Sequence, residues 1–168
     1  KNRKNILIID SGSGVLSSYI QKSILQFNKL NDYHFFIAEK YSIKGENVTL
    51  IPSNALFTDY IAYMDLVIGR AGFNTISECI AYRTPMLLLS EENNPEMKEN
   101  LIFIKKEELG SFISTERFCK NLVSFLPQFY ENEYNQILSK MHNHNIKKNG
   151  AEVIAQNILD TITKQKRN

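Results

Sequence analysis

Short apolar runs alternate along the chain with stretches in which apolar residues recur every three or four positions. The runs favour β-branched and aromatic residues, and they predict strands at residues 6–9, 33–38, 48–51, 66–68, 86–89 and 111–113. The periodic stretches predict helices at residues 15–28, within 53–64, from 74 or 75 onward, and at 100–106, 116–126, 131–142 and 151–163. This alternation predicts a Rossmann-like α/β fold, a three-layer α/β/α sandwich around a parallel sheet of about six strands.

The most informative stretch is residues 63–78, which read YMDLVIGRAGFNTISE. A short apolar run is broken at residues 69–72, and a helix follows whose apolar face holds Ile76, Cys79 and Ile80. One interpretation of the residues after the break is purely local. Asn74 or Thr75 would cap the helix, and the segment 75–78 would form a capping box.

The alternative interpretation of the same stretch is ligand binding. Open α/β sheets bind ligands where a helix begins just outside the carboxyl end of a strand, because free N–H groups face outward there. A small residue would let a diphosphate approach the backbone, and a glutamate one turn into the helix could accept hydrogen bonds from two ribose hydroxyls. The candidate ligand contacts are then Arg70, Gly72, Phe73, Asn74, Thr75 and Glu78. The pattern leaves both interpretations open.

Composition fits one domain and gives no sign of nucleic-acid binding. With 168 residues, of which 43% are hydrophobic and 23% charged, the chain is long enough for one compact domain over residues 1–168. Its 20 basic and 18 acidic side chains are dispersed and leave a formal charge of +2. Small basic clusters near residues 147–148 and 164–167 are typical of solvated surface, and contact of the tail with an anionic membrane is the alternative.

The cysteines and the apolar runs bear on the compartment. Cys79 and Cys119 fall inside predicted helices without metal-type spacing, which favours a reduced, cytoplasmic protein over a disulfide scaffold. No apolar run approaches the roughly 20 residues needed to span a membrane, and no signal peptide opens the chain. Because the chain starts without Met directly before a predicted strand, we expect it to be part of a longer protein.

The central stretch, together with Pro85 and the apolar run at 86–89, resembles the nucleotide-sugar-binding half of B-type glycosyltransferases. It is most similar to the bacterial N-acetylglucosaminyltransferases that complete the peptidoglycan lipid precursor, and to their relatives. The resemblance extends from a glycine loop at 10–14 to a closing helix that begins near 150–151. It implies the donor-binding, C-terminal half of a two-domain enzyme, which takes a hexosyl or N-acetylhexosaminyl group from a UDP-sugar.

The loop after the first predicted strand contains Ser11, Gly12, Ser13 and Gly14. Glycines between a strand and a helix allow a tight turn with outward amides, which suits an anion or serves as a plain structural turn. Neither G-x-G-x-x-G nor G-K-S/T is present. The resemblance implies that this loop lies beside the donor phosphates and the acceptor, although the family often has more glycine where Asp10 and Ser11 stand.

Two other segments gain expected roles from the resemblance. Residues from Ser53 to Leu56 would contact the uracil edge through the main chain. Phe57 would contribute an apolar wall for the base, although its residue type favours a place in the core. The polar stretch 90–100 is either a solvated loop or, by resemblance, holds sugar hydroxyls through Glu96 and Asn100. Met97 stands where the family has Gln, and because a thioether is a poor acceptor and no donor, the identity of the sugar stays open.

The sequence identifies no catalytic base. His34, His142 and His144 lie away from the central stretch, and the resemblance implies a base and an acceptor site on the other domain, which could also touch the inner face of the membrane. Asp10 and Asp65 are not spaced as a metal pair, so we expect neither a metal nor another cofactor. A nucleotide-sugar hydrolase of the same fold and a non-catalytic nucleotide-sugar-binding subunit remain as alternative functions.

Overall fold

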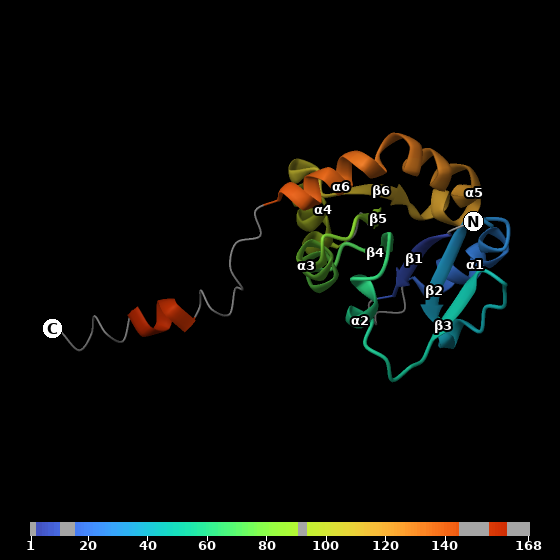
Figure 1. Cartoon of the computed structure of the whole chain (residues 1–168), viewed down its shortest axis with the longest axis horizontal. Coiled ribbons are helices and arrows are strands. Elements are labelled where there is room, and N and C mark those ends of the chain that lie inside the picture. The colour runs from blue at the N-terminus through green and yellow to red at the C-terminus, as the bar shows by residue number, and fades with distance from the viewer. Residues whose placement is uncertain (1–2, 11–15, 91–93, 145–154, 161–168) are drawn as a thin grey trace.

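The computed structural model describes residues 3–10, 16–90, 94–144 and 155–160. Its centre is a sheet of six parallel strands in the order β3-β2-β1-β4-β5-β6 (Figure 1). The strands are β1 (Lys4–Ile9), β2 (Tyr33–Ala38), β3 (Val48–Ile51), β4 (Leu66–Arg70), β5 (Met86–Ser90) and β6 (Gly110–Ser114). The predicted Rossmann-like α/β fold and all six predicted strands are confirmed.

Helices cover both faces of this sheet (Figure 1). They are α1 (Ser17–Phe27), the 3₁₀-helix η1 (Glu39–Tyr41), α2 (Thr58–Ile61), α3 (Phe73–Tyr82), α4 (Pro95–Glu107), α5 (Thr115–Asn132) and α6 (Tyr134–Asn143). Helices α1 and α5 pack together on one face, α2, α3 and α4 lie on the other, and α6 packs against α5. Residues 155–160 are helical, and the rest of the helix predicted for 151–163 lies outside the described residues.

The core is formed by the apolar central strands and by aromatic side chains beneath α1 and α5. Residues 66–70 of β4 are all buried, as expected for a strand covered on both faces. The ring centroid of Phe27 lies 4.7 Å from that of Phe35 and 6.4 Å from that of Phe118, which joins α1 to both the sheet and α5. Large aromatic rings contribute much of the burial that stabilises a domain of this size.

The order in which strands are added to the sheet reverses between β1 and β4, which are parallel neighbours with Ile9 opposite Gly69. After β1 the strands are added toward β3, and after β4 they are added toward β6. In doubly wound sheets, ligands bind in the crevice at the carboxyl ends of the two strands where this reversal occurs. A Cβ atom at Gly69 would lie 3.1 Å from the Ile9 carbonyl oxygen, so the two strands approach closely just before that edge.

Several helix starts differ from the prediction, among them that of α6, which begins at Tyr134 rather than at residue 131, and two at the carboxyl edge of the sheet. Helix α4 begins at Pro95 rather than at Asn100, so most of the stretch predicted as a polar loop is helical. The cause is a local cap, in which the Asn94 side chain accepts a hydrogen bond from the Met97 N–H over 3.2 Å and proline occupies the first helical position. Helix α3 begins at Phe73, directly after the strand, rather than at Asn74 or Thr75.

A buried asparagine fastens the turn between α1 and β2. Asn47 is 3% exposed, and its Nδ2 lies 2.9 Å from the carbonyl oxygen of Phe27, 3.1 Å from that of Leu30 and 3.3 Å from that of Tyr33. Backbone N–H groups also donate to the carbonyl oxygens of Phe27 and Leu30, so removal of the amide takes away additional hydrogen bonds to buried groups rather than the sole ones.

We therefore expect Asn47→Ala to lower the free energy of unfolding by about 1 to 3 kcal/mol, because it removes the side-chain hydrogen bonds that hold the carbonyl groups of Phe27, Leu30 and Tyr33 together. Urea unfolding followed by circular dichroism measures the change. Lys44→Ala, at an exposed position in the same loop, serves as the control. Equal midpoints for the two variants would show that the asparagine is not what holds the turn.

Candidate functional site

The carboxyl edge of the sheet gathers most of the residues that the sequence singled out. All six strands are parallel, so the segments that follow β1, β3, β4 and β5 emerge at the same edge. The predicted contacts at this edge that fall within the described residues are Ser53, Phe57, Arg70, Gly72, Phe73, Asn74, Thr75, Glu78, Glu96 and Asn100. The loop with Ser11, Gly12, Ser13 and Gly14 lies outside the described residues.

The turn from β4 into α3 presents an open helix start. Gly72 is the N-cap, with extended backbone angles of φ −72° and ψ 141°, and a Cβ atom built on it would have nothing within 4 Å. Its carbonyl oxygen accepts the first helical hydrogen bond, from Ile76 N over 3.1 Å. Phe73 and Asn74 follow at exposed positions, and the first N–H groups of a helix have no partner within it. The turn therefore offers backbone donors and room for an anion.

The capping box predicted for residues 75–78 is wrong. Thr75 is 6% exposed and lies within the first turn of α3, so it cannot act as the cap. The glutamate turns instead toward α2, where Glu78 Oε1 accepts a hydrogen bond from Thr58 Oγ1 over 3.2 Å. This contact ties the segment after β3 to α3 and leaves Glu78 half-buried one turn into the helix.

Helix α4 is fastened to the same turn. Asn100 Nδ2 donates a hydrogen bond to the Ala71 carbonyl oxygen over 2.7 Å, which brings the helix against the β4–α3 connection. Glu96 precedes Asn100 by four residues and is exposed, so the two side chains share one face of α4. Met97 is 6% exposed and belongs to the hydrophobic core, so it offers no polar atom to this face.

Two predicted contacts are wholly or partly buried. Arg70, the last residue of β4, is 7% exposed. Phe57 is half-buried and packs against the core, in line with the alternative that its role is structural. Ser53, by contrast, is exposed at the beginning of the segment that follows β3. Ligand contacts by these three residues stay predictions.

A buried carboxylate at the end of β1 is a feature that sequence reasoning missed. Asp10 Oδ2 accepts hydrogen bonds from Lys40 Nζ over 3.0 Å, from Ser17 Oγ over 3.1 Å and from the Tyr41 hydroxyl. Its side chain is 1% exposed. Burial acts to raise the pKa of Asp10, but hydrogen bonds from Tyr41, Lys40 and Ser17 together outweigh it, so the pKa lies below its ordinary value. The carboxylate is therefore charged at neutral pH.

A second carboxylate next to this cluster contacts the segment after β3. Glu39 Oε1 accepts hydrogen bonds from Ser53 Oγ over 2.6 Å and from Ser53 N over 2.8 Å. The side-chain and backbone hydrogen bonds from Ser53 lower the pKa of Glu39. The feature of the sequence that could have indicated this cluster is the charged and aromatic triplet Glu39-Lys40-Tyr41, directly after a predicted strand.

Two of the described histidines make contacts away from this edge. His34 Nε2 lies 2.8 Å from Thr49 Oγ1, a cross-strand contact between β2 and β3, and burial lowers the pKa of His34. His142 Nδ1 lies 2.9 Å from the Leu138 carbonyl oxygen within α6. Within the described part of the chain, no group of three His, Cys, Asp or Glu side chains could hold a metal ion. Nor is any described helix both long and apolar enough to cross a bilayer.

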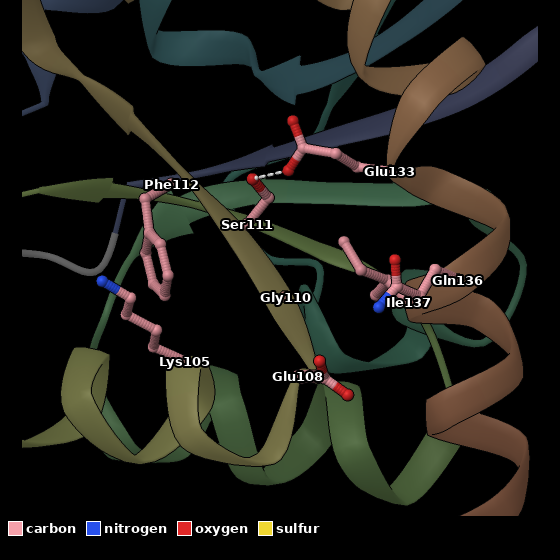
Figure 2. A pocket seen from close by; sticks show the side chains of 8 residues that line it. All are labelled: Lys105, Glu108, Gly110, Ser111, Phe112, Glu133, Gln136 and Ile137. Carbon is pink, nitrogen blue, oxygen red and sulfur yellow. Dashed lines mark hydrogen bonds between the residues drawn. The ribbon is translucent and has the colours of Figure 1, made fainter.

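A pocket of about 200 Å³ lies at the other end of the sheet (Figure 2). It is lined by the first residues of β6 together with the end of α4 and residues at the start of α6, and in it Ser111 donates a hydrogen bond to Glu133. Because β6 runs parallel to the other strands, its first residues lie at the amino edge, away from the β4–α3 turn. This pocket is therefore separate from the candidate site.

Comparison with known proteins agrees with the fold. The chain is 32% identical over 117 residues to a UDP-N-acetylglucosamine–N-acetylmuramyl-(pentapeptide) pyrophosphoryl-undecaprenol N-acetylglucosamine transferase of Thermosipho africanus, and the match covers 66% of this chain and 34% of that protein. Among solved structures, it is similar to MurG of Acinetobacter baumannii, with a TM-score of 0.68, 16% identity and coverage of 98% of this chain and 50% of that chain.

The glycosyltransferase SnogD of Streptomyces nogalater is a further structural neighbour, with a TM-score of 0.61, 14% identity and coverage of 94% of this chain and 43% of that chain. The chain thus spans between a third and a half of the length of these relatives. Residues 14–158 match the family model of the glycosyltransferase family 28 C-terminal domain. Since that match covers most of the chain, the protein belongs to glycosyltransferase family 28 and represents its C-terminal domain.

Proposed function

We propose that this domain binds the nucleotide-sugar donor, a UDP-sugar, of a two-domain glycosyltransferase. The observation that carries the proposal is the open start of α3 at the reversal point of the sheet, where Gly72 has empty space beside it and exposed backbone donors follow. An anion at this place meets unpaired N–H groups and the positive end of the helix dipole. A diphosphate fits both requirements.

Each part of the donor has a matching segment at the carboxyl edge. The diphosphate lies on the first turn of α3 and beside the loop of residues 11–14, and the ribose hydroxyls are held by Glu78. Residues 53–57 face the base through their backbone. The sugar lies against the face of α4 that carries Glu96 and Asn100, which the hydrogen bond to Ala71 holds next to the phosphate position. Met97 in the core leaves one polar contact fewer for the sugar.

The chemistry assigned to this domain is stabilisation of the leaving group. Transfer forms a bond between an acceptor oxygen and the anomeric carbon of the sugar, and it breaks the bond from that carbon to the diphosphate. The diphosphate oxygen takes up the negative charge, which the amides of Phe73, Asn74 and Thr75 and the helix dipole stabilise. A base on the partner domain removes the proton from the acceptor.

The acceptor and the catalytic base therefore belong to an N-terminal domain that faces this edge across a cleft. The name of the relative from Thermosipho africanus supports N-acetylglucosamine as the transferred sugar and an undecaprenol-linked acceptor. An acceptor of that kind would bring the partner domain to the membrane surface. Free cysteines, with Cys79 buried and Cys119 half-buried, support a reducing, cytoplasmic compartment.

We expect Gly72→Val to abolish UDP binding while the domain stays folded. The side chain would enter the space assigned to the diphosphate, and neither the backbone angles nor the surroundings of Gly72 oppose it. Replacing a glycine N-cap costs up to about 1 kcal/mol, so the melting temperature should fall only slightly. Isothermal titration calorimetry with UDP, paired with a thermal melt, measures both effects.

Ala62→Val, at the exposed end of α2, is the matched control for this substitution. It introduces the same side chain away from the β4–α3 turn and should leave UDP affinity unchanged. UDP binding by the Gly72 variant equal to that of the control would contradict the assignment of the diphosphate to this turn.

We expect Glu78→Gln to weaken UDP binding about tenfold, because a hydrogen bond from a ribose hydroxyl to a charged carboxylate is worth roughly 1.5 to 3 kcal/mol. The glutamine keeps an oxygen that can accept from Thr58, so the contact between α2 and α3 is preserved. The matched ligand is 2′,3′-dideoxy-UDP, which lacks both ribose hydroxyls.

The two proteins and two ligands form a double-mutant cycle. If Glu78 holds the ribose, the substitution has no further effect on the dideoxy nucleotide. An equal loss with both ligands would mean that the glutamate acts on the fold of the site rather than on the hydroxyls.

A further inference from the structure

Three consecutive residues after β2 contact the ends of the strands on both sides of it. Glu39, Lys40 and Tyr41 form η1, and β2 lies between β1 and β3 in the sheet. Lys40 and Tyr41 reach Asp10 at the end of β1, whereas Glu39 reaches Ser53 just after β3. One short helix thus connects two segments that are more than 40 residues apart in sequence.

The contact on the β1 side is buried and charged. Asp10 lies one residue before the loop of residues 11–14, and its side chain is 1% exposed. Ser17, at the start of α1, hydrogen-bonds to the same oxygen over 3.1 Å and lies 3.1 Å from the Tyr41 hydroxyl. The end of β1, at Asp10, and the start of α1, at Ser17, are therefore both joined to η1.

Charge is balanced in this cluster. A lone carboxylate at the end of β1, beside the end of β4 where the diphosphate is proposed to bind, would repel it, and the repulsion would be strong because the group is partly removed from water. Lys40 Nζ, 3.0 Å from Asp10 Oδ2, supplies the compensating positive charge and is itself half-exposed. Asp10 can thus serve as an anchor without making the site repulsive to anions.

The contact on the β3 side holds the first residue of the segment 53–57. Glu39 Oε1 accepts from both the backbone N–H and the hydroxyl of Ser53, which fixes the direction in which the chain leaves β3. Backbone groups of this segment can recognise a base only if they are held in place before it arrives. Preorganisation of that kind raises affinity because the segment loses less conformational entropy when the base binds.

We propose that η1 is a positioning element of the nucleotide site, in which Glu39 orients the segment that meets the base, and Lys40 with Tyr41 orients and neutralises Asp10 beside the phosphates. The inference rests on the proposed function, because the two segments gain their meaning from a bound nucleotide. These are positioning residues, since each acts through Asp10 or Ser53 rather than on the ligand.

The test compares uridine, which has no phosphate, with UDP. Glu39→Ala should weaken the binding of both ligands by the same factor, about fivefold to tenfold for the loss of two hydrogen bonds to a carboxylate. Glu39→Gln keeps an acceptor oxygen and should restore most of the affinity. Lys40→Met should weaken UDP binding by a similar factor and leave uridine binding unchanged. Lys40→Arg keeps the charge and should restore the affinity for UDP.

Amide shifts in NMR titrations give the dissociation constants, and thermal melts confirm that each variant is folded. Glu46→Ala, an exposed carboxylate before the amino end of β3, is the control and should bind as the wild type does. If the wild type binds both ligands and Glu39→Ala and Lys40→Met bind them with the same affinities, the inference is overturned and the proposed function stays intact.

An equal loss of affinity for uridine and UDP in Lys40→Met would also overturn the inference. Such a result would mean that the lysine orders the whole site rather than compensating charge at the phosphates. Should Lys40→Met fail to fold, Tyr41→Phe takes its place. We expect it to weaken the binding of UDP but not of uridine, and an equal loss of affinity for both ligands would contradict the inference. A wild-type domain that binds neither ligand would refute the proposed function itself, and with it this inference.

Discussion

Parallel pairing of all six strands, with a reversal of strand order between β1 and β4, is the constraint on which the site depends. It brings the segments after β1, β2, β3, β4 and β5 to one edge, and doubly wound sheets bind ligands at this edge where the strand order reverses. Because α3 begins immediately after β4, its first N–H groups lie at that edge without helical partners. The anion-binding character of the edge thus follows from backbone geometry before any side chain is considered.

Side-chain hydrogen bonds then convert this edge from a set of separate loops into one site. Asn100 fastens α4 to the β4–α3 turn through Ala71, and Thr58 fastens the segment after β3 to α3 through Glu78. The cluster around Asp10 joins the ends of β1 and β2 in the same way. Each contact orders residues that would otherwise lose conformational entropy when a ligand binds, which is the physical reason for placing them around a binding edge.

The strands could be predicted from the sequence, since runs such as 86–89 and 33–38 are apolar enough for a sheet covered on both faces. Helix starts were harder. Gly72 caps α3 without a side chain, so the more obvious caps at Asn74 and Thr75 misled the prediction, and the Asn94-Pro95 start of α4 was hidden in a polar stretch. The pairs Asp10–Lys40 and Asn100–Ala71 lie about 30 residues apart in sequence, and local pattern carries no information on such contacts.

The central claim is that a nucleoside diphosphate sugar binds at the carboxyl edge of the sheet. An NMR titration of the domain with UDP-N-acetylglucosamine, followed through backbone amide shifts, tests it most directly. If the donor binds there, we expect shifts concentrated in residues 53–57, 72–78 and 96–100, which follow three different strands at that edge. Saturating shifts confined to the pocket at the amino end of β6, around Ser111 and Glu133, or no shifts at millimolar ligand, would contradict it.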